Sequence, residues 1–329
     1  MWRGCEHLDP CLIFLLFKKY LVGHIQDNQG DIQFLHNHVT VHSRTEFEDY
    51  PEPERKRHLL RLWLATPGVE PVQVPAGRWP SRVSMELVEL AAGVYVVRGV
   101  RTGFHHMVVA TKQGLVVADA PAGWVELQQF PPTDLVPGLG ISGLSEGLVD
   151  FLAAEFPGRP IRAVALTHHH DDHAGGARAF AAAGAEVYAP AEVSDFLETA
   201  LNRDAMPADR LSEANGAVRV AAVADTVTLE DADYPVRLIN LGESPHAVSS
   251  LGVLAGGYFF QSDLHVPNSD AAEPRAERSV TECWFADWAV ENLPADTVVI
   301  NTHSTVETPV SRLARYLESP LCSGAAVEP

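Results

Sequence analysis

Hydrophobic and polar residues follow two kinds of pattern along the chain after residue 85. Valine-rich runs broken by glycine predict consecutive strands over 86–98, 106–111 and 114–118. Apolar residues at helical spacing predict a helix over 144–156, and a short apolar run predicts a buried strand over 161–166. Beyond it, the same reasoning predicts strands over 186–188, 217–223, 227–229, 236–239, 250–255, 258–261 and 297–300, and helices over 176–183, 191–201, 282–292 and 309–318. Runs of strands with helices between them are typical of a layered α/β architecture in which helices cover two sheets.

This pattern is interrupted before residue 83. Four prolines, Pro67, Pro71, Pro75 and Pro80, break any periodicity between residues 65 and 82 and predict a linker. Charge changes at nearly the same place, because residues 1–61 hold 8 Lys+Arg and 9 Asp+Glu out of 24 and 43 in the whole chain. We therefore expect segments over 1–64, 65–82 and 83–320, followed by a tail over 321–329.

The net charge narrows the kinds of partner. The 329 residues carry a formal charge of −19, which argues against binding to nucleic acid or to an anionic membrane surface, since both need an excess of lysine and arginine. A small-molecule substrate is the expected partner, and the sequence indicates no oligomeric state.

The cysteines and the first apolar run indicate the cellular compartment in which the protein is expected. Four cysteines, Cys5, Cys11, Cys283 and Cys322, have no Cys-x-x-Cys spacing and are too few for a disulfide framework, so a reduced, cytoplasmic setting is expected. The apolar run over 11–17 is short, and Lys18 and Lys19 end it. We expect neither a signal peptide nor a membrane span.

A histidine-rich motif follows the strand predicted over 161–166. It has the form His-x-His-x-Asp-His and supplies His168, His170, Asp172 and His173. Imidazole nitrogens and carboxylate oxygens are ligands that suit zinc and similar divalent metals. One isolated histidine is more often a surface or core residue than a ligand, but four such groups on one tight loop favour metal binding. Alternate positions can direct two histidines to one ion and the Asp-His pair to another.

This motif resembles the first motif of the metallo-β-lactamase fold superfamily, and the resemblance covers about residues 85–320. In that family a histidine, an aspartate at a strand end and a further histidine follow, and His246, Asp263 and His303 occupy those places. The resemblance implies a four-layer αββα sandwich with two divalent metal ions. By that resemblance, the ligands of the first metal are His168, His170 and His246, and those of the second are Asp172, His173 and His303, with Asp263 bridging.

The resemblance also implies an activity. Two metal ions, with zinc expected first and iron or manganese as alternatives, would make hydroxide from a shared water for attack on an ester, thioester, lactone or phosphoester. Asp172 would be the catalytic residue that orients this water or accepts its proton. With an aspartate at position 263 the chain resembles the glyoxalase, lactonase and phosphodiesterase branches of the family. True β-lactamases commonly carry cysteine or serine at that position. Antibiotic hydrolysis is therefore not the expected main role.

Other histidines near these positions have weaker claims. His169 and Asp171 occupy the intervening positions of the motif and are expected to point away and support the loop. His265 lies two residues after Asp263, so it either borders the pocket or has a supporting or surface role. His105 and His106 open a predicted strand and are not expected to be ligands.

Two further patterns are interpreted as structural. Trp284 and Trp288 lie four residues apart on a predicted helix, where core packing is the favoured explanation. Residues 143–147 spell Gly-x-Ser-x-Gly, the nucleophile elbow of serine hydrolases, but prolines and glycines precede them in place of a strand. Ser142 or Ser145 is therefore expected to cap a helix.

The N-terminal segment has a resemblance of its own. Residues 24–64 are similar to the C-terminal end of the taurine dioxygenase-like iron and 2-oxoglutarate enzymes, which implies His42 as the last iron ligand, Arg57 as the 2-oxoglutarate-binding residue and Arg61 near the substrate. The two other iron ligands and most of the strands that carry them are missing, and one imidazole does not hold a catalytic iron. We interpret the segment as a short, incomplete β-rich piece without function.

Two alternatives to a hydrolase stay open at this point. One is a mononuclear-iron oxidoreductase on the same fold, such as a persulfide dioxygenase. The other is a non-catalytic metal-binding module, because a fold does not guarantee an activity. The substrate is set by loops such as 122–141 and 267–281, whose shape the sequence does not define.

Overall fold

A computed structural model describes residues 85–101, 103–122, 142–205, 208–229, 235–268 and 273–323. The chain divides into two units, Met1–Ala65 and Thr66–Pro329, and all described residues belong to the second. The predicted segments over 1–64 and 65–82 and the dioxygenase-like residues His42, Arg57 and Arg61 lie outside the described part.

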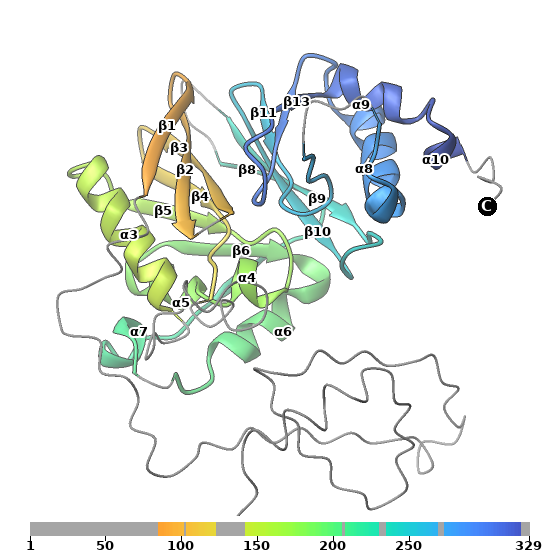
Figure 1. Cartoon of the computed structure of the whole chain (residues 1–329). Coiled ribbons are helices and arrows are strands. Elements are labelled where there is room, and N and C mark those ends of the chain that lie inside the picture. Colours follow the sequence, from red (N-terminus) through yellow and green to blue (C-terminus); the bar gives the residue numbers. More distant parts are fainter. Residues whose placement is uncertain are drawn as a thin grey trace, which may run out of the picture. The chain divides into compact units, whose positions relative to one another are not determined.

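The first sheet has seven strands in the order of the sequence, β1 to β7 (Figure 1). Neighbouring strands are antiparallel from β1 to β4 and parallel from β4 to β7. Their bounds are β1 Glu86–Ala91, β2 Val94–Arg101, β3 Phe104–Thr111, β4 Gly114–Ala118, β5 Ile161–Ala165, β6 Glu186–Pro190 and β7 Val220–Val223.

The second sheet has six strands in the order β13-β12-β11-β10-β9-β8. All neighbours are antiparallel except the parallel pair β11 and β12. Their bounds are β8 Thr226–Leu229, β9 Val236–Gly242, β10 Ser250–Ala255, β11 Tyr258–Phe260, β12 Val298–Ile300 and β13 Thr308–Pro309.

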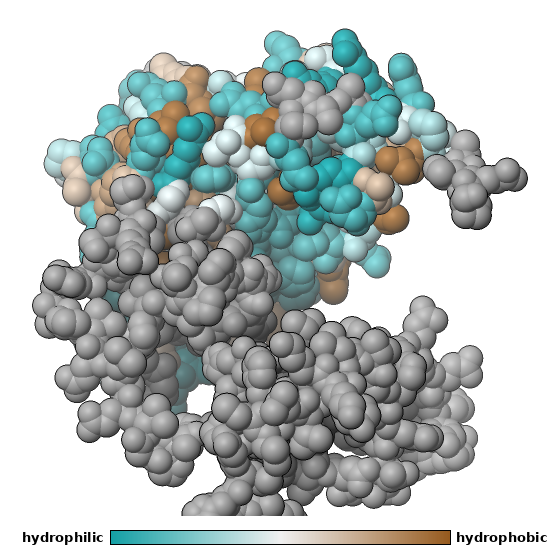
Figure 2. All heavy atoms as spheres, in the orientation of Figure 1, coloured by the Kyte–Doolittle hydropathy of each residue, from teal (hydrophilic) through white to brown (hydrophobic). Residues whose placement is uncertain are grey.

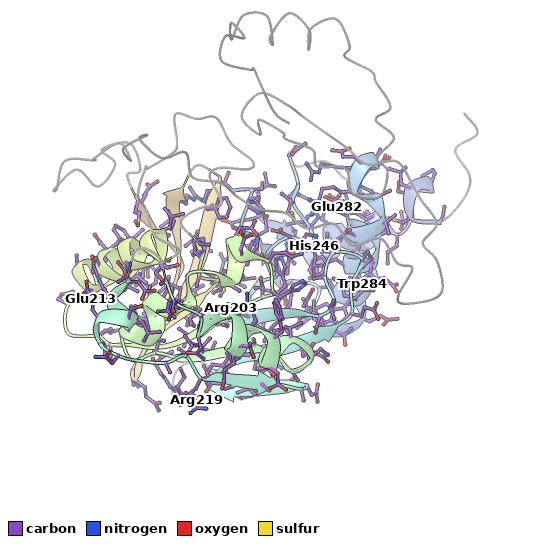
Figure 3. The ribbon with its side chains drawn as sticks, turned by 90° about the horizontal axis from the view of Figure 1, so that it is seen from below. Arg203, Glu213, Arg219, His246, Glu282 and Trp284 are labelled. Atoms are coloured by element: carbon purple, nitrogen blue, oxygen red, sulfur yellow. A yellow bond between two sulfur atoms is a disulfide. The ribbon has the colours of Figure 1, made fainter. Side chains whose placement is uncertain are left out.

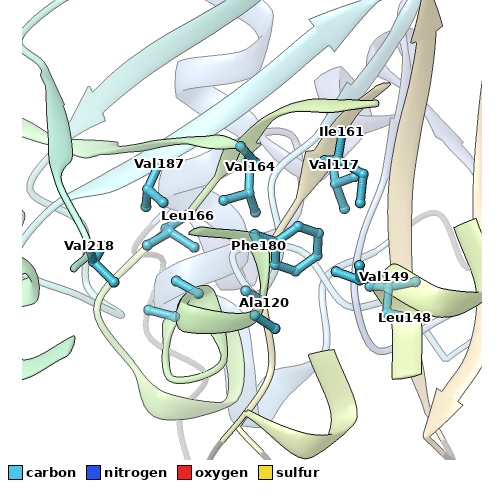
Figure 4. Close-up of a cluster of buried hydrophobic side chains, with 14 of the residues drawn as sticks. Val117, Ala120, Leu148, Val149, Ile161, Val164, Leu166, Phe180, Val187 and Val218 are labelled. Atoms are coloured by element: carbon cyan, nitrogen blue, oxygen red, sulfur yellow. The ribbon is translucent and has the colours of Figure 1, made fainter. Parts of the chain in front are cut away.

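Helices cover the outer faces of both sheets. The helices are α3 Gly143–Glu155, α4 Asp171–Ala174, α5 Ala177–Ala182, α6 Ala191–Leu201, α7 Arg210–Glu213, η3 Ala276–Arg278, α8 Ser279–Asn292, α9 Val310–Tyr316 and α10 Pro320–Ser323. One core lies between the first sheet and its helices, around Phe180 and Leu148 (Figure 4). A second core joins the two sheets, around Met107 and Val253, and a third lies under α8 and α9, around Phe285. The expected αββα sandwich is confirmed.

Hydrophilic residues predominate on the described surface that Figure 2 shows, with apolar residues scattered among them. The apolar side chains are instead concentrated in the three cores, where burial of apolar area is the main stabilising term. Among the described residues, no helix combines the length and apolar character that a membrane span needs.

The predicted elements differ from the observed ones where segments are short. The strand predicted over 86–98 is a hairpin, because the chain turns at Gly93, whose φ of +79° suits glycine. Helix α10 lies in the stretch predicted as a tail. The short elements α4, α7, η3, β13 and α10 were not predicted, since two to four residues are too few to show periodicity.

A disulfide joins Cys283 on α8 to Cys322 on α10, 39 residues apart. The cysteine spacing did not indicate this bond, because the packing of α10 on α8 brings the two residues together. The compartment expected from the cysteine count stays a prediction.

Candidate metal centre

The seven predicted ligands lie at one edge of the sandwich, where strands of both sheets end. His168 to His173 follow β5, His246 lies in the loop between β9 and β10, Asp263 follows β11, and His303 follows β12. Figure 3 shows His246 between the two sheet halves of the domain.

Main-chain hydrogen bonds join the two sheets at this edge. The Leu251 N–H donates to the Thr167 carbonyl at 2.7 Å, and the His105 N–H donates to the Thr302 carbonyl at 2.8 Å. Residues from both sheets are thus fixed relative to one another where the ligands lie.

One group of ligand atoms consists of three histidines. His168 Nε2 lies 2.9 Å from His170 Nδ1 and 3.2 Å from His246 Nε2. His168 is buried, and the other two rings are partly exposed. Three imidazole nitrogens that converge in this way could hold one metal ion.

A second group combines two carboxylates and two histidines: Asp172, His173, Asp263 and His303. His173 Nε2 lies 3.2 Å from Asp172 Oδ2 and 3.3 Å from Asp263 Oδ2. His303 Nε2 lies 3.1 Å from Asp263 Oδ1. Within each group the ligand atoms lie within 4.8 Å of one another.

The Asp263 carboxylate connects the two groups. Its Oδ2 also lies 3.3 Å from His246 Nε2, which belongs to the first group. One carboxylate with an oxygen near each group is the arrangement that a bridging ligand requires.

The outer nitrogens of the histidines have partners in the protein. His173 Nδ1 donates to Asp119 Oδ2 at 2.9 Å, and His303 Nδ1 donates to the Gly103 carbonyl at 3.0 Å. Such bonds fix the ring orientation and leave Nε2 free to act as the ligand. His168 Nδ1 lies 3.1 Å from the hydroxyl of Thr167.

Charges and burial within the cluster shift the pKa values of its members. Burial raises the pKa of the Asp263 carboxyl, but the positive charge of His173 and the close contacts with the nitrogens of His173, His246 and His303 hold that pKa well below its usual range. Burial lowers the pKa of His173, but the charges of Asp263 and Asp119 raise it well above its usual range. Burial, followed by the charge of His173, holds the pKa of His168 well below its usual range.

The residues fit a divalent metal ion. His173 Nε2 is buried and has no hydrogen-bond partner among the described residues, although two carboxylates lie within 3.3 Å of it. A buried polar atom without a partner is costly, and a cation at this point would satisfy the nitrogen and both carboxylates together.

The other histidines singled out in the sequence lie outside this cluster. His169 is partly buried, and its ring meets that of Phe196 at 6.1 Å, while Asp171 is exposed. His265 is fully buried against Phe285 and Tyr316, and burial lowers its pKa to about 3. Of the interpretations open for His265, the supporting role agrees with the structure.

The tandem histidines on β3 are also not among the converging ligand atoms. His106 is fully buried and its Nδ1 lies 3.0 Å from the Ala118 carbonyl, while His105 is partly exposed. Trp288 stacks on Phe259 with ring centroids 5.4 Å apart, which confirms core packing for this helix.

The Gly-x-Ser-x-Gly stretch is not a nucleophile elbow. It opens α3, and Ser145 is buried with its hydroxyl donating to the Pro121 carbonyl at 2.9 Å. Ser142 occupies the N-cap position, but its hydroxyl donates to Asp209 at 2.6 Å and makes no capping bond. The prediction that Ser142 or Ser145 caps the helix is therefore confirmed for the position of Ser142, without a capping hydrogen bond from its side chain.

Sequence reasoning missed Asp119 and Ser262, the residues behind His173. Both have positive φ, +66° and +64°, which is uncommon for residues other than glycine. Ser262 Oγ lies 2.8 Å from His173 Nδ1. A polar residue directly after the buried strand 114–118 was the available signal for Asp119, but no spacing relates it to the histidine motif.

Residues 140–303 match the sequence model of the Metallo-beta-lactamase superfamily. The chain has no significant match among curated proteins.

Several solved structures are similar to the chain. The metallo-beta-lactamase from Pontibacter korlensis is 17% identical, with a TM-score of 0.47, over 70% of this chain and 96% of that one. The DIM-1 metallo-beta-lactamase is 15% identical, with a TM-score of 0.48, over 74% and 99%. The metallo beta lactamase from Hirschia baltica is 17% identical, with a TM-score of 0.45, over 70% and 95%.

Proposed function

Since residues 140–303 carry a metallo-beta-lactamase superfamily domain, we propose that this protein is a metal-dependent hydrolase with two divalent metal ions. Its substrate is a small molecule with an ester, thioester, lactone or phosphoester bond. The observation that carries the proposal is the Asp263 carboxylate, which lies 3.3 Å from His246 of one ligand group and 3.1 Å from His303 of the other.

The donor set indicates which metals the site would hold. His168, His170 and His246 would bind the first ion, and Asp172, His173 and His303 the second, with Asp263 shared. Nitrogen and carboxylate oxygen without thiolate suit zinc, which we favour, and also suit iron and manganese.

The chemistry follows from the ions and from the residues around them. Divalent ions lower the pKa of water toward neutrality and polarise a carbonyl or phosphoryl oxygen. Asp172, which is largely buried beside His173, would orient the attacking water and accept its proton. The pKa of Asp172 lies below its usual range, because burial raises it less than the close contact with His173 and the charge of that ring lower it. Asp172 is therefore ionised and able to accept at neutral pH.

We propose that β-lactam antibiotics are not the main substrate. The shared position holds the carboxylate of Asp263, where the resemblance associates true β-lactamases with cysteine or serine. The carboxylate at this position supports an activity like that of the ester- and phosphoester-cleaving branches of the superfamily.

The decisive experiment combines metal analysis with a substrate panel. The purified full chain is analysed for zinc, iron and manganese, then assayed with ester, thioester, lactone, phosphodiester and β-lactam substrates before and after chelation. About two metal ions per chain, with turnover that chelation abolishes and metal restores, is the expected result.

Other outcomes would favour the alternatives. One iron per chain with oxygen consumption on a persulfide would indicate the dioxygenase-like oxidoreductase. Metal binding without turnover of any substrate would indicate a binding module, and a protein that binds no metal would overturn the proposal.

A further inference from the structure

His303 lies in a segment that is neither helix nor strand. Residues 301–307, between β12 and β13, form bends and irregular chain. The His303 N–H donates to Asn301 Oδ1 at 3.0 Å, which fixes the main chain but not the ring. The torsion that turns an imidazole ring has broad minima, because it joins a tetrahedral carbon to a trigonal one. The orientation of the His303 ring is therefore set by the groups that surround it.

Three consecutive residues where β3 begins, Gly103 to His105, contact this segment. The Gly103 carbonyl accepts from His303 Nδ1 at 3.0 Å. The His105 N–H donates at 2.8 Å to the carbonyl of Thr302, the residue before His303. Between them, the Phe104 ring meets the His303 ring edge to face, with centroids 4.7 Å apart and planes at 89°. The two hydrogen bonds fix one nitrogen and the main chain, and the Phe104 ring restricts the plane of the imidazole.

Phe104 also contacts the other histidine of the second ligand group. Its ring stacks on that of His173, with centroids 6.4 Å apart and planes at 29°. Phe104 is fully buried, and side chains in a close-packed interior restrict one another. The three histidines of the first group pack on one another, with ring centroids 4.5 to 4.9 Å apart. The printed ring contacts thus associate Phe104 with the second group.

A metal ligand must be held close to its productive position, within about 0.5 Å and 10–20°. Groups behind the ligands supply this precision, and their replacement weakens metal binding. At His303 the Gly103 carbonyl is a main-chain atom, which a side-chain replacement does not remove. Phe104 is the side chain in this segment that packs on the ligand rings.

We propose that Phe104 is a positioning residue for the second metal ion. It holds the rings of His173 and His303 with their Nε2 atoms facing the Asp263 carboxylate, 3.3 and 3.1 Å away. This inference rests on the proposed function and adds that occupancy by the second ion depends on an apolar residue outside the ligand set. The ion bound by the three-histidine group should depend on Phe104 much less.

Metal binding by the full chain tests the inference. The metal-free chain is titrated with zinc in competition with a chelator, which gives an affinity for each ion. The variants are Phe104→Leu, which keeps an apolar side chain without the ring, and Phe104→Met, whose longer side chain fills more of the space. Phe180→Leu is the matched control, because Phe180 is equally buried but lies in the core between the first sheet and its helices.

We expect both Phe104 variants to weaken the binding of one ion about 10- to 100-fold and to leave the other near its wild-type affinity. Phe180→Leu should lower the thermal stability of the chain without changing either affinity. Double variants identify the ion that is lost. Phe104→Leu should keep its full effect in His246→Ala, which lacks a ligand of the first ion, and should have a smaller effect in His303→Ala.

Three results would overturn the inference. The first is unchanged affinity for both ions in the Phe104 variants. The second is equal weakening of both ions. The third is the same loss of metal in Phe180→Leu, which would attribute the effect to the stability of the fold.

Metal-free protein separates failure of the inference from failure of the hydrolase proposal. A chain that binds both ions but cleaves no substrate still gives the affinities that decide on Phe104. If the wild type binds no metal, the hydrolase proposal fails, and NMR of the metal-free chain with isotope-labelled histidine decides instead. A His303 Nδ1 proton that is protected from exchange in the wild type and in Phe180→Leu, but not in Phe104→Leu, supports the inference. Equal protection in all three proteins refutes it.

Discussion

His173 is the residue on which the polar groups of the site converge. Its Nε2 faces Asp172 and Asp263, while its Nδ1 lies between Asp119 and Ser262. Contacts on both sides hold the ring in one orientation, with the proton of Nδ1 directed at Asp119 and Nε2 directed at the two carboxylates. The two residues behind it have positive φ, so backbone strain is concentrated where the ring is fixed.

Replacing Asp119 with asparagine should therefore weaken metal binding through the tautomer of His173. Asparagine tolerates positive φ and can still accept from the Thr167 N–H, which lies 2.8 Å from Asp119 Oδ1. Its NH2 group would face His173 Nδ1 and shift the proton to Nε2, the ligand atom. We expect metal affinity to fall about 10- to 100-fold, measured by competition with a chelator.

The matched control is Asp171→Asn, at an exposed residue of α4, the short helix that also carries His173. It should leave metal affinity and thermal stability near wild type. Unchanged metal affinity in Asp119→Asn would contradict the assigned role of Asp119.

Asp172→Ala tests the proposed proton acceptor. Without this carboxylate the attacking water loses its orienting group, so we expect kcat to fall by about 10²- to 10⁴-fold, with some loss of metal from the second group. The measurement pairs steady-state kinetics with elemental analysis. A variant with full metal occupancy and wild-type turnover would rule the role out.

At the residue scale, the sequence was sufficient to predict which side chains converge. His168 to His173 share one motif, and His246, Asp263 and His303 were placed by family order, and all seven lie together in the structure. Asp119 was not predicted, because it acts through a contact between distant segments. The Asp119 carboxylate meets a ring 54 residues away, and no local pattern encodes such a pairing.

At the scale of elements, a buried ion pair joins the helices on the first sheet. Arg178 of α5 donates to Asp209 from Nε at 2.6 Å and from Nη2 at 2.8 Å, and to the Leu201 carbonyl at the end of α6. Asp209 caps α7 through the Ser212 N–H and also accepts from Ser142 at the start of α3. One carboxylate thus connects three helices.

Breaking this pair should destabilise the domain strongly. Arg178→Met leaves the Asp209 charge buried without its partner, which costs about 3–5 kcal/mol, measured as the free energy of unfolding in urea. The exposed pair of Arg210 and Asp150, 2.6 Å apart, is the control, and Arg210→Gln should cost about 1 kcal/mol or less. Similar losses in the two variants would contradict the assignment.

The contribution of Asp209 also depends on pH in a defined direction. Burial raises its pKa, but hydrogen bonds from Arg178, Ser142 and Ser212 outweigh burial and hold the pKa below its usual range. The folded state therefore binds this proton less readily than the unfolded state does. The stabilisation is complete above the ordinary aspartate pKa and is lost as pH falls below it.

Elements long enough to show periodicity were predicted well. Helix α6 was predicted with its observed bounds, Ala191–Leu201, and β10 likewise, because an uninterrupted apolar pattern defines each. The four-residue helices α4 and α7 have no such pattern. Helix α4 is one turn within the segment that carries the metal-ligand motif. Helix α7 begins where the Asp209 side chain caps its N-terminus.

At the scale of the whole molecule, the described part of the chain contains all seven predicted ligands. The seven ligands lie between His168 and His303. The three apolar cores that support the strands next to these ligands comprise residues between Met85 and Cys322. Residues Met1–Ala65 form the other unit of the chain. The metal centre and its supporting hydrogen bonds are therefore attributable to the second unit.

Removing residues 1–80 should then leave metal content and hydrolase activity intact. The described strands start at Glu86, so the truncation keeps β1 and its pairing with β2, and no ligand or hydrogen bond described at the site is lost. The two proteins would be compared by metal analysis, by kcat/KM on the substrate found for the full chain, and by thermal unfolding of the domain. A second truncation that also removes β1, ending at residue 92, serves as the contrast, because it exposes the edge of β2 and should lower stability. If the shorter truncation alone lost metal or activity, the N-terminal segment would have a function, contrary to the prediction that it has none.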